Sequence, residues 1–263
     1  MNQNNPNSLF TKAALLLAST LTVMSGATVS PSLPAMEDFF SKVANLGNIE
    51  ILIRLVITLP ALFIVIGSPI AGVIVDRLGR KPLLLAGVIF YGFAGVSGFL
   101  LNDLTSILIG RAFLGLSVAS VMVSATTLIA DYYIGAARAT FMGLQAAFMG
   151  LGGVIFLSLG GALASASWRY PFLIYLFSWL LIPLVIFSIY ERRRIQTGET
   201  TANKEVSNNS SVPVSLLLMI FGITTLIQII FYLIPVQLPF YLRGLVNATP
   251  QQSGNAIACC KST

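Results

Sequence analysis

The segment at residues 72–82, GVIVDRLGRKP, gathers charged side chains in a chain that has few of them. Only 9% of the 263 residues are charged, and long apolar segments lie on both sides of this one. Asp76 comes at the end of an apolar segment. A carboxylate at the carboxyl end of a helix opposes the helix dipole, so Asp76 needs a cation or the amino end of another helix as its partner. The same segment offers Arg77, Arg80 and Lys81.

A second short loop repeats this arrangement. Asp131 ends one apolar segment and Arg138 begins the next, and each side chain lies at the dipole end that disfavours its charge. We expect crossed pairing of Asp76, Arg80, Asp131 and Arg138 to form a latch, closed in one state of an alternating protein and open in the other. The alternative is a topology signal with a tight turn at Gly79, which can adopt a positive φ. The predicted latch residues are Gly72, Asp76, Arg77, Gly79, Arg80, Lys81, Asp131 and Arg138.

The composition argues against catalysis. The chain has no histidine, and no acid lies inside an apolar segment, so general-base and metal chemistry lack their usual groups. Cys259 and Cys260 are adjacent and fit neither a metal site nor a disulfide framework. No phosphate-binding loop of the type G-x-x-x-x-G-K-[ST] occurs. We therefore expect no enzyme activity, no cofactor and no metal site.

Seven apolar segments are long enough to be membrane spans. About 20 apolar residues in a helix cross a hydrocarbon core of about 30 Å. The apolar fraction of 56% and the mean hydropathy of +0.87 indicate lipid as the main solvent. The net charge of +6 then suits membrane loops better than nucleic acid, which we do not expect as a partner. The predicted spans are residues 13–35, 51–75, 83–101, 104–130, 138–164, 170–190 and 213–242.

The distribution of Lys and Arg predicts the orientation. Nine of the 15 basic residues lie in the amino-terminal tail and in the loops on its side of the membrane. Basic loops face the cytoplasm, so we expect a cytoplasmic amino terminus in a bacterial-type inner membrane. A cleaved signal peptide is the alternative for the first span, but the span is long and six more follow. Pro31 and Pro34 predict a kink, a break or an end near the outer end of the first helix.

Three regions follow from these spans. Residues 1–190 form a six-span bundle, residues 191–212 form a polar cytoplasmic linker rich in Asn and Ser, and residues 213–263 begin a second, incomplete bundle.

Four polar side chains inside the predicted spans could line a substrate pathway. Arg111 is the one basic residue well inside a span, and burying its charge costs at least about 2.5–3.5 kcal/mol on insertion scales. We expect it to face protein or a water-filled cavity; the alternative is that it snorkels to the outer boundary. For the three glutamines, hydrogen bonding between helices is the alternative. The four residues are Arg111, Gln145, Gln228 and Gln237.

These motifs resemble those of the major facilitator superfamily. GVIVDRLGRKP is similar to its loop motif G-x-x-x-D-R-x-G-R-[KR] at every defined position. Arg111, in LIGRAFLGLSVAS, resembles the fourth-helix arginine motif, although Leu114 and Ser117 replace the usual Gln and Gly. SWRYPF, residues 167–172, resembles the W-R-x-x-F that precedes the sixth helix.

Small residues predict close helix packing. The fifth span matches the glycine spacing of the family's antiporter motif, but Phe156-Leu157 replaces its central Gly-Pro, which argues against proton-driven drug antiport. We expect these glycines, and those of the third span, to pack helices closely. They are Gly143, Gly152, Gly160 and Gly161 in the fifth span and Gly92, Gly95 and Gly98 in the third.

The resemblance covers residues 10–242, the first half of the family's fold plus its seventh helix. It implies an all-α membrane protein, with a six-helix bundle of the major-facilitator type and a seventh transmembrane helix. It also implies a secondary, gradient-driven carrier that moves a small solute by alternating access, with membrane lipids and possibly a coupling ion as further partners. We expect this copy to be truncated. The alternatives are a half-transporter that works as a homodimer or with a separate second half, and a non-transporting membrane interaction or regulatory protein.

Overall fold

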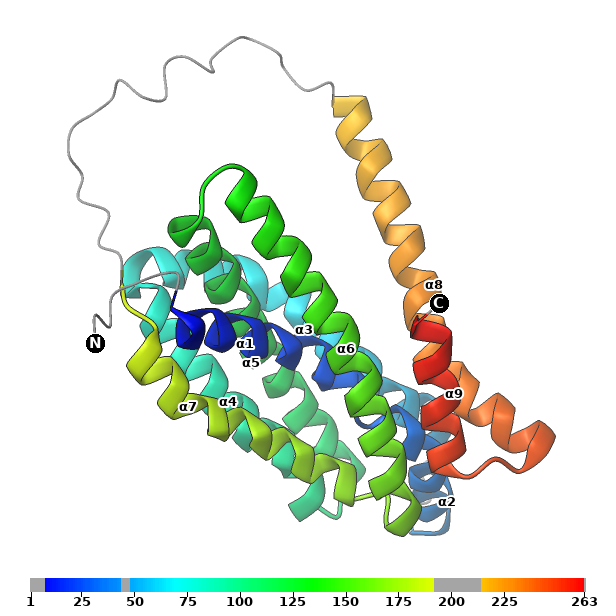
Figure 1. Ribbon diagram of the computed structural model, residues 1–263. Helices are drawn as coiled ribbons and strands as arrows, with labels where there is room; N and C mark the ends of the chain where they lie inside the picture. The colour runs from blue at the N-terminus through cyan, green and yellow to red at the C-terminus, as the bar shows by residue number, and fades with distance from the viewer. Residues whose placement is uncertain (1–7, 44–47, 192–213, 263) are drawn as a thin grey trace, which may run out of the picture.

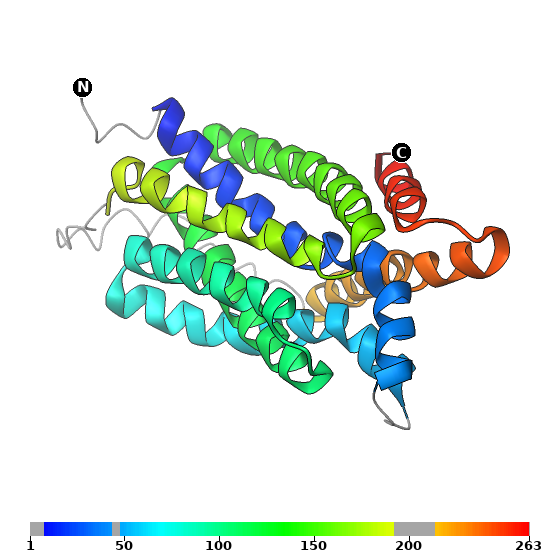
Figure 2. The same cartoon turned by 90° about the horizontal axis from the view of Figure 1, so that it is seen from below.

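The computed structural model of this chain describes residues 8–43, 48–191 and 214–262. These residues form helices and no strands. Figures 1 and 2 show a bundle of long helices with α8 standing to one side. In chain order the elements are α1 (Leu9–Ala27), η1 (Ser30–Ser32), α2 (Leu33–Val43), α3 (Ile49–Leu78), α4 (Arg80–Leu100), α5 (Leu104–Tyr132), α6 (Ala136–Ala166), η2 (Tyr170–Leu176), α7 (Phe177–Ser188), α8 (Val214–Val246) and α9 (Pro250–Ser262).

Within the described ranges, seven helical segments are long and apolar enough to cross a membrane. The helices α3, α5 and α6 have 30, 29 and 31 residues. Each is therefore about 45 Å long and exceeds a hydrocarbon core of about 30 Å, so it must tilt or extend beyond the core. The segments follow the order of the seven predicted spans, and the prediction of an all-α membrane fold is confirmed.

The first span is interrupted at its two prolines. Pro31 and Pro34 have no N–H to donate to the carbonyls of Ala27 and Ser30, the residues four positions earlier. The α-helix accordingly ends at Ala27, a 3₁₀ turn follows, and the chain resumes as α2.

Helical structure then continues beyond the predicted end of this span at residue 35. The charges of Glu37 and Asp38 suggested a loop, but α2 continues to Val43. One face of α2 is buried: Phe40 is 1% exposed, and its ring centroid lies 5.5 Å from that of Trp168. This packing keeps the segment helical despite its charges.

Glycines allow α4 to lie directly against η2 and α7, as the sequence predicted. A Cβ atom added at Gly92, Gly95 or Gly98 would come within 2.1, 2.3 and 1.8 Å of an aromatic side chain. No side chain larger than hydrogen fits at these positions without displacing a ring. The rings belong to Trp179, Tyr175 and Phe172, respectively.

The last two helices divide between separation and close packing. In Figure 1 the first half of α8 stands away from α6, and its described side chains from Ser215 to Ile229 are exposed. Near its end α8 contacts α2, η1 and α9, and α9 packs along α6. The predicted linker lies outside the described residues, except for Glu191 at its start.

Candidate functional site

A cavity of about 590 Å³ lies between the bundle and α8. Gln228 and Tyr232 lie near the midpoint of α8, so the cavity is at mid-membrane depth. The lining combines aliphatic and thioether side chains with a few hydroxyls and one amide. It consists of Thr22, Val23, Ser25, Gly26, Ala27, Ile57, Ile64, Val118, Met122, Met149, Leu157, Gln228, Tyr232, Ile234, Pro235 and Ile257.

This lining suits a largely apolar ligand. The hydroxyls of Thr22 and Ser25 donate to carbonyls of their own helix at 2.7 and 2.8 Å, and so offer a ligand mainly acceptor lone pairs. Met122 and Met149 are flexible and polarisable, so they adapt to different shapes. None of the described residues that line the cavity is a carboxylate.

Of the four predicted pathway residues, only Gln228 lines this cavity. The side-chain amide of Gln145 donates to the Ser19 hydroxyl at 2.8 Å and so ties α6 to α1. Gln237 is half-buried on α8 outside the lining.

Arg111 lies behind the cavity wall. Its side chain is 2% exposed, which rules out snorkelling, and its guanidinium centre lies 4.5 Å from the ring centroid of Phe172. Nη1 donates to the Tyr175 hydroxyl at 2.8 Å and to the Ser25 carbonyl at 3.5 Å. The Tyr175 hydroxyl donates to the same carbonyl at 2.7 Å. Arg111 therefore ties α5 to η2 and to α1, and it reaches the cavity only through Ser25.

One end of the cavity is closed by contacts between α8 and the broken first span. The guanidinium of Arg243, near the end of α8, donates to the Asp38 carboxylate and, at 2.8 Å, to the carbonyl of Pro34. These two bonds join α8 to α2.

A third contact at this end follows from the prolines of α8. Pro239 has no N–H, so the carbonyl of Pro235 has no donor within the helix. The Ser30 hydroxyl of η1 donates to this carbonyl. We call the pairs Asp38–Arg243, Pro34–Arg243 and Ser30–Pro235 the gate contacts.

Glycines bring α6 close to η1 and α9 at the same end. A Cβ atom at Gly160 would lie 2.1 Å from the Thr28 carbonyl oxygen, and one at Gly161 would lie 2.8 Å from the carbonyl oxygen of Pro250. On the facing helix, a Cβ atom at Gly254 would lie 2.6 Å from the Leu157 carbonyl oxygen.

The other two glycines of this predicted packing set differ. A Cβ atom at Gly152 would lie 3.2 Å from Thr20 on α1, a tight contact, whereas at Gly143 it would face open space. Gly143 therefore packs against no other helix in this arrangement.

The opposite end of the bundle, which we call the basic end, carries a charge cluster of Arg80, Asp131 and Glu191. Nε of Arg80 lies 3.1 Å from the Asp131 carboxylate, and Nη1 lies 4.0 Å from that of Glu191. Glu191 also accepts the backbone N–H groups of Arg80 and Lys81 at 2.9 and 3.0 Å. Its carboxylate thus satisfies unpaired N–H groups at the start of α4 and complements the helix dipole.

Gly79 is the turn that makes this arrangement possible. Its φ is +98°, in the region that favours glycine, and a Cβ atom here would lie 2.9 Å from Glu191. The expected positive φ is confirmed, and the carboxylate occupies the space that a side chain would need.

The other predicted latch residues do not join the cluster. Asp76, Arg77 and Arg138 are exposed and form no ion pair within the described part of the chain, and Gly72 has no neighbour against it. Lys81 donates to the carbonyl of Ile186 at 2.7 Å. The crossed arrangement is thus present only as the Arg80–Asp131 pair, because Arg138 is remote from Asp76 in this arrangement.

A helical membrane bundle with a broken first span and a cavity at mid-membrane depth is an arrangement found in secondary transporters. The sequence model of the Major Facilitator Superfamily matches residues 15–259, so the chain belongs to this family.

Similar proteins include bacterial drug-resistance proteins. The chain is 29% identical over 161 residues to the multidrug transporter protein MdtP of Bacillus subtilis, covering 61% of this chain and 28% of that one. It is 27% identical over 194 residues to the quinolone resistance protein NorB of Staphylococcus aureus, covering 73% of this chain and 39% of that one. The chain therefore spans less than half the length of these relatives.

The fold has a match among solved structures. The crystal structure of a D-xylose–proton symporter superimposes with a TM-score of 0.74 at 17% identity, covering 96% of this chain and 65% of that one. At this identity the likeness shows the fold alone.

The sequence did not indicate several residues of the site. Glu191 stood in a segment interpreted as linker, and Ser25 was interpreted as a packing residue. The Asp38–Arg243 pair joins residues that are 205 positions apart, and nothing local announces it. For Ser30 a signal did exist: two prolines four residues apart in α8 leave a carbonyl that needs a donor.

Proposed function

We propose that this chain forms the first half, and the start of the second half, of a secondary transporter that moves a small solute by alternating access. The observation that carries the proposal is the cavity itself. It lies at mid-membrane depth, the gate contacts close it at one end, and α8 diverges from α6 toward the basic end. A site closed to one side and exposed to the other is what alternating access requires.

The basic end would face the cytoplasm of a bacterial-type inner membrane. The bias of Lys and Arg supports this orientation, as does the bacterial origin of the relatives. The arrangement would then be the inward-facing state, with the gate contacts on the outside. Residues 1–190 would form the first bundle, residues 191–212 the linker, and residues 213–263 the start of the second bundle.

The latch would act at the basic end. The charge cluster holds α4, α5 and the end of the first bundle together, and Asp76 remains exposed beside it. In the outward-facing state Asp76 would accept the amino end or a cation of the second bundle, which would relieve its unfavourable place at the end of α3. Arg77 and Arg138 remain available for the same interface.

The substrate would be a small, mainly apolar solute with a few hydrogen-bonding groups. The thioethers and the sparse hydroxyls of the cavity support this, and drug-resistance proteins are among the relatives. An ion gradient would drive transport, because the chain carries no nucleotide-binding loop of the Walker type.

The test is solute flux into liposomes that contain the purified chain, alone and together with the second half of a relative. A panel of apolar and polar solutes is measured with an ion gradient and after its collapse. We expect gradient-dependent flux of apolar solutes that falls at least about tenfold in Gln228→Leu, since an amide lost from the site leaves its hydrogen-bonding partner on the solute unpaired. Thr225→Val is the matched control, because Thr225 lies outside the lining and its hydroxyl donates to Phe221 of its own helix. Absence of flux in both preparations would contradict the proposal and would favour a non-transporting role.

A further inference from the structure

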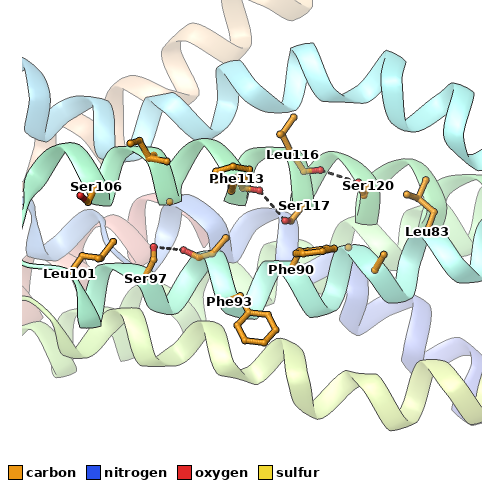
Figure 3. A pocket seen from close by; sticks show the side chains of 15 residues that line it. Leu83, Phe90, Phe93, Ser97, Leu101, Ser106, Phe113, Leu116, Ser117 and Ser120 are labelled. Atoms are coloured by element: carbon orange, nitrogen blue, oxygen red, sulfur yellow. Dashed lines mark hydrogen bonds between the residues drawn. The ribbon is translucent and has the colours of Figure 1, made fainter.

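A second hollow lies between α4 and α5 (Figure 3), apart from the central cavity. Its volume is about 740 Å³. The main contacts of α8 and α9 are with α2, α6 and η1, so this groove lies on a different face of the bundle from the proposed transport site. It is lined by Leu83, Ala86, Gly87, Phe90, Phe93, Ala94, Ser97, Leu101, Ser106, Ile109, Gly110, Phe113, Leu116, Ser117 and Ser120.

Large and small residues together form the groove. Phe90, Phe93 and Phe113 are 63%, 60% and 60% exposed, so they stand on a surface that faces lipid. Small residues lie between them and leave the space open. At Gly87 a Cβ atom would come within 2.9 Å of Val121, so α4 and α5 approach closely beneath the groove.

The hydroxyls in the groove are not available to a polar ligand. Ser97, Ser117 and Ser120 donate to carbonyls of their own helices at 2.7, 2.9 and 3.0 Å, as the dashed lines in Figure 3 show. The Ser106 hydroxyl is bonded to Asp103 at 3.1 Å. The groove therefore presents an apolar surface, and its ligand must be apolar along its length.

The groove follows the membrane normal. Leu83 and Leu101 are 18 positions apart, which is about 27 Å along a helix and close to the hydrocarbon thickness of about 30 Å. Leu83 lies directly after Arg80 and Lys81 at the basic end. The ammonium of Lys81 has three donors, and the Ile186 carbonyl takes one of them. Donors thus remain at the groove's basic end for a phosphate.

We propose that this groove binds an anionic phospholipid from the leaflet at the basic end, with one acyl chain between α4 and α5 and the phosphate at Lys81. The apolar length of the groove suits the chain, and the charge at its end suits the headgroup. The site is independent of the transport cavity, so it stands or falls separately from the proposed function.

The experiment is native mass spectrometry of the delipidated chain in detergent, titrated with phosphatidylglycerol. We expect one phospholipid to bind more tightly than the others. The double variant Ala86→Leu/Ser120→Leu fills the half of the groove near the basic end. Each buried methylene is worth roughly a fourfold gain in affinity, so losing two of them weakens binding more than about tenfold. Ala146→Leu, at an exposed position of α6, is the matched control and keeps the full affinity.

A second variant tests the headgroup without filling the groove. Lys81→Gln is expected to reduce the preference for phosphatidylglycerol over phosphatidylcholine several-fold, while circular dichroism confirms an unchanged helix content. Equal affinity in the filled and unsubstituted chains would mean that lipid binds elsewhere and would overturn the proposal. So would a dimer that disappears in the filled variant, because a second copy would then occupy the groove.

Discussion

At the scale of single residues, Arg111 holds the bundle together. It is a cation within a span, it has two aromatic rings beside it, and in the described part of the chain it has no carboxylate partner. The stacked rings and the hydrogen bond to Tyr175 replace the hydration that the guanidinium loses on burial.

We predict that Arg111→Ala lowers the free energy of unfolding in detergent by about 2–4 kcal/mol, since a hydrogen bond to a charged group and a desolvated cation–π contact are each worth roughly 1–3 kcal/mol. Arg111→Met is the matched variant. It fills most of the space and removes the desolvation penalty of the cation, so it should cost less than alanine. Thermal unfolding followed by circular dichroism measures both. Unchanged stability combined with lost solute binding would instead place Arg111 in the transport site.

What the sequence could predict of single residues depended on how local the cause was. Gly79 was predictable because a turn between two helices needs a positive φ at one position. Arg80 and Asp131 were predictable because each lies at an unfavourable dipole end, and opposite misfits can pair. Gln145 and Gln237 were not separable from Gln228, because all three are amides in apolar helices and only the packing decides which face meets the cavity.

At the scale of elements, α5 begins with a side-chain cap. Asp103 accepts the backbone N–H of Ser106 at 2.9 Å and its hydroxyl at 3.1 Å. The backbone bond from Ser106 is the main reason that the pKa of Asp103 is below its usual value. A carboxylate with a depressed pKa stabilises the folded state above the pKa of the unfolded chain, about 3.9 for Asp, and this stabilisation is lost as the pH falls through the folded pKa.

We predict that Asp103→Asn, which keeps an oxygen at the cap, unfolds at nearly the same temperature as the unsubstituted chain near pH 7. Below about pH 4 the unsubstituted chain should lose this advantage and the Asn variant should not. Thermal unfolding in detergent between pH 3 and 7 compares the two. Parallel pH profiles would show that the cap contributes nothing.

The helices themselves were largely predictable, because a run of about 20 apolar residues has no stable alternative to a helix in lipid. Their ends were not. The span predicted to stop at residue 35 continues as α2 because Phe40 packs against Trp168, and such a contact between distant segments leaves no mark in the local sequence. The helix α9 forms on α6 for a similar reason, through the approach of Gly161 and Gly254.

At the scale of the whole molecule, the two ends of the cavity are held by different interactions. The gate contacts join α8 to η1 and α2, whereas the charge cluster lies within the first bundle and makes no bond to α8. Breaking the gate contacts should therefore shift the position of α8 without disturbing the bundle. That separation makes the gate testable by itself.

We predict that Arg243→Gln opens the end of the cavity beyond the gate contacts. The Asp38–Arg243 pair is half-exposed, so its loss is worth no more than about 1 kcal/mol, and that energy changes the ratio of two states roughly fivefold. The measurement is labelling of Thr22→Cys in the cavity by a membrane-impermeant maleimide, with Cys259 and Cys260 replaced by serine. Labelling from the gate side should rise up to about fivefold in Arg243→Gln. The charge exchange Asp38→Arg/Arg243→Asp should restore slow labelling in part, because it rebuilds the ion pair but not the bond from Arg243 to the Pro34 carbonyl. Labelling that stays the same in all three chains would mean that the packing of α9 on α6, rather than these charges, keeps this end closed.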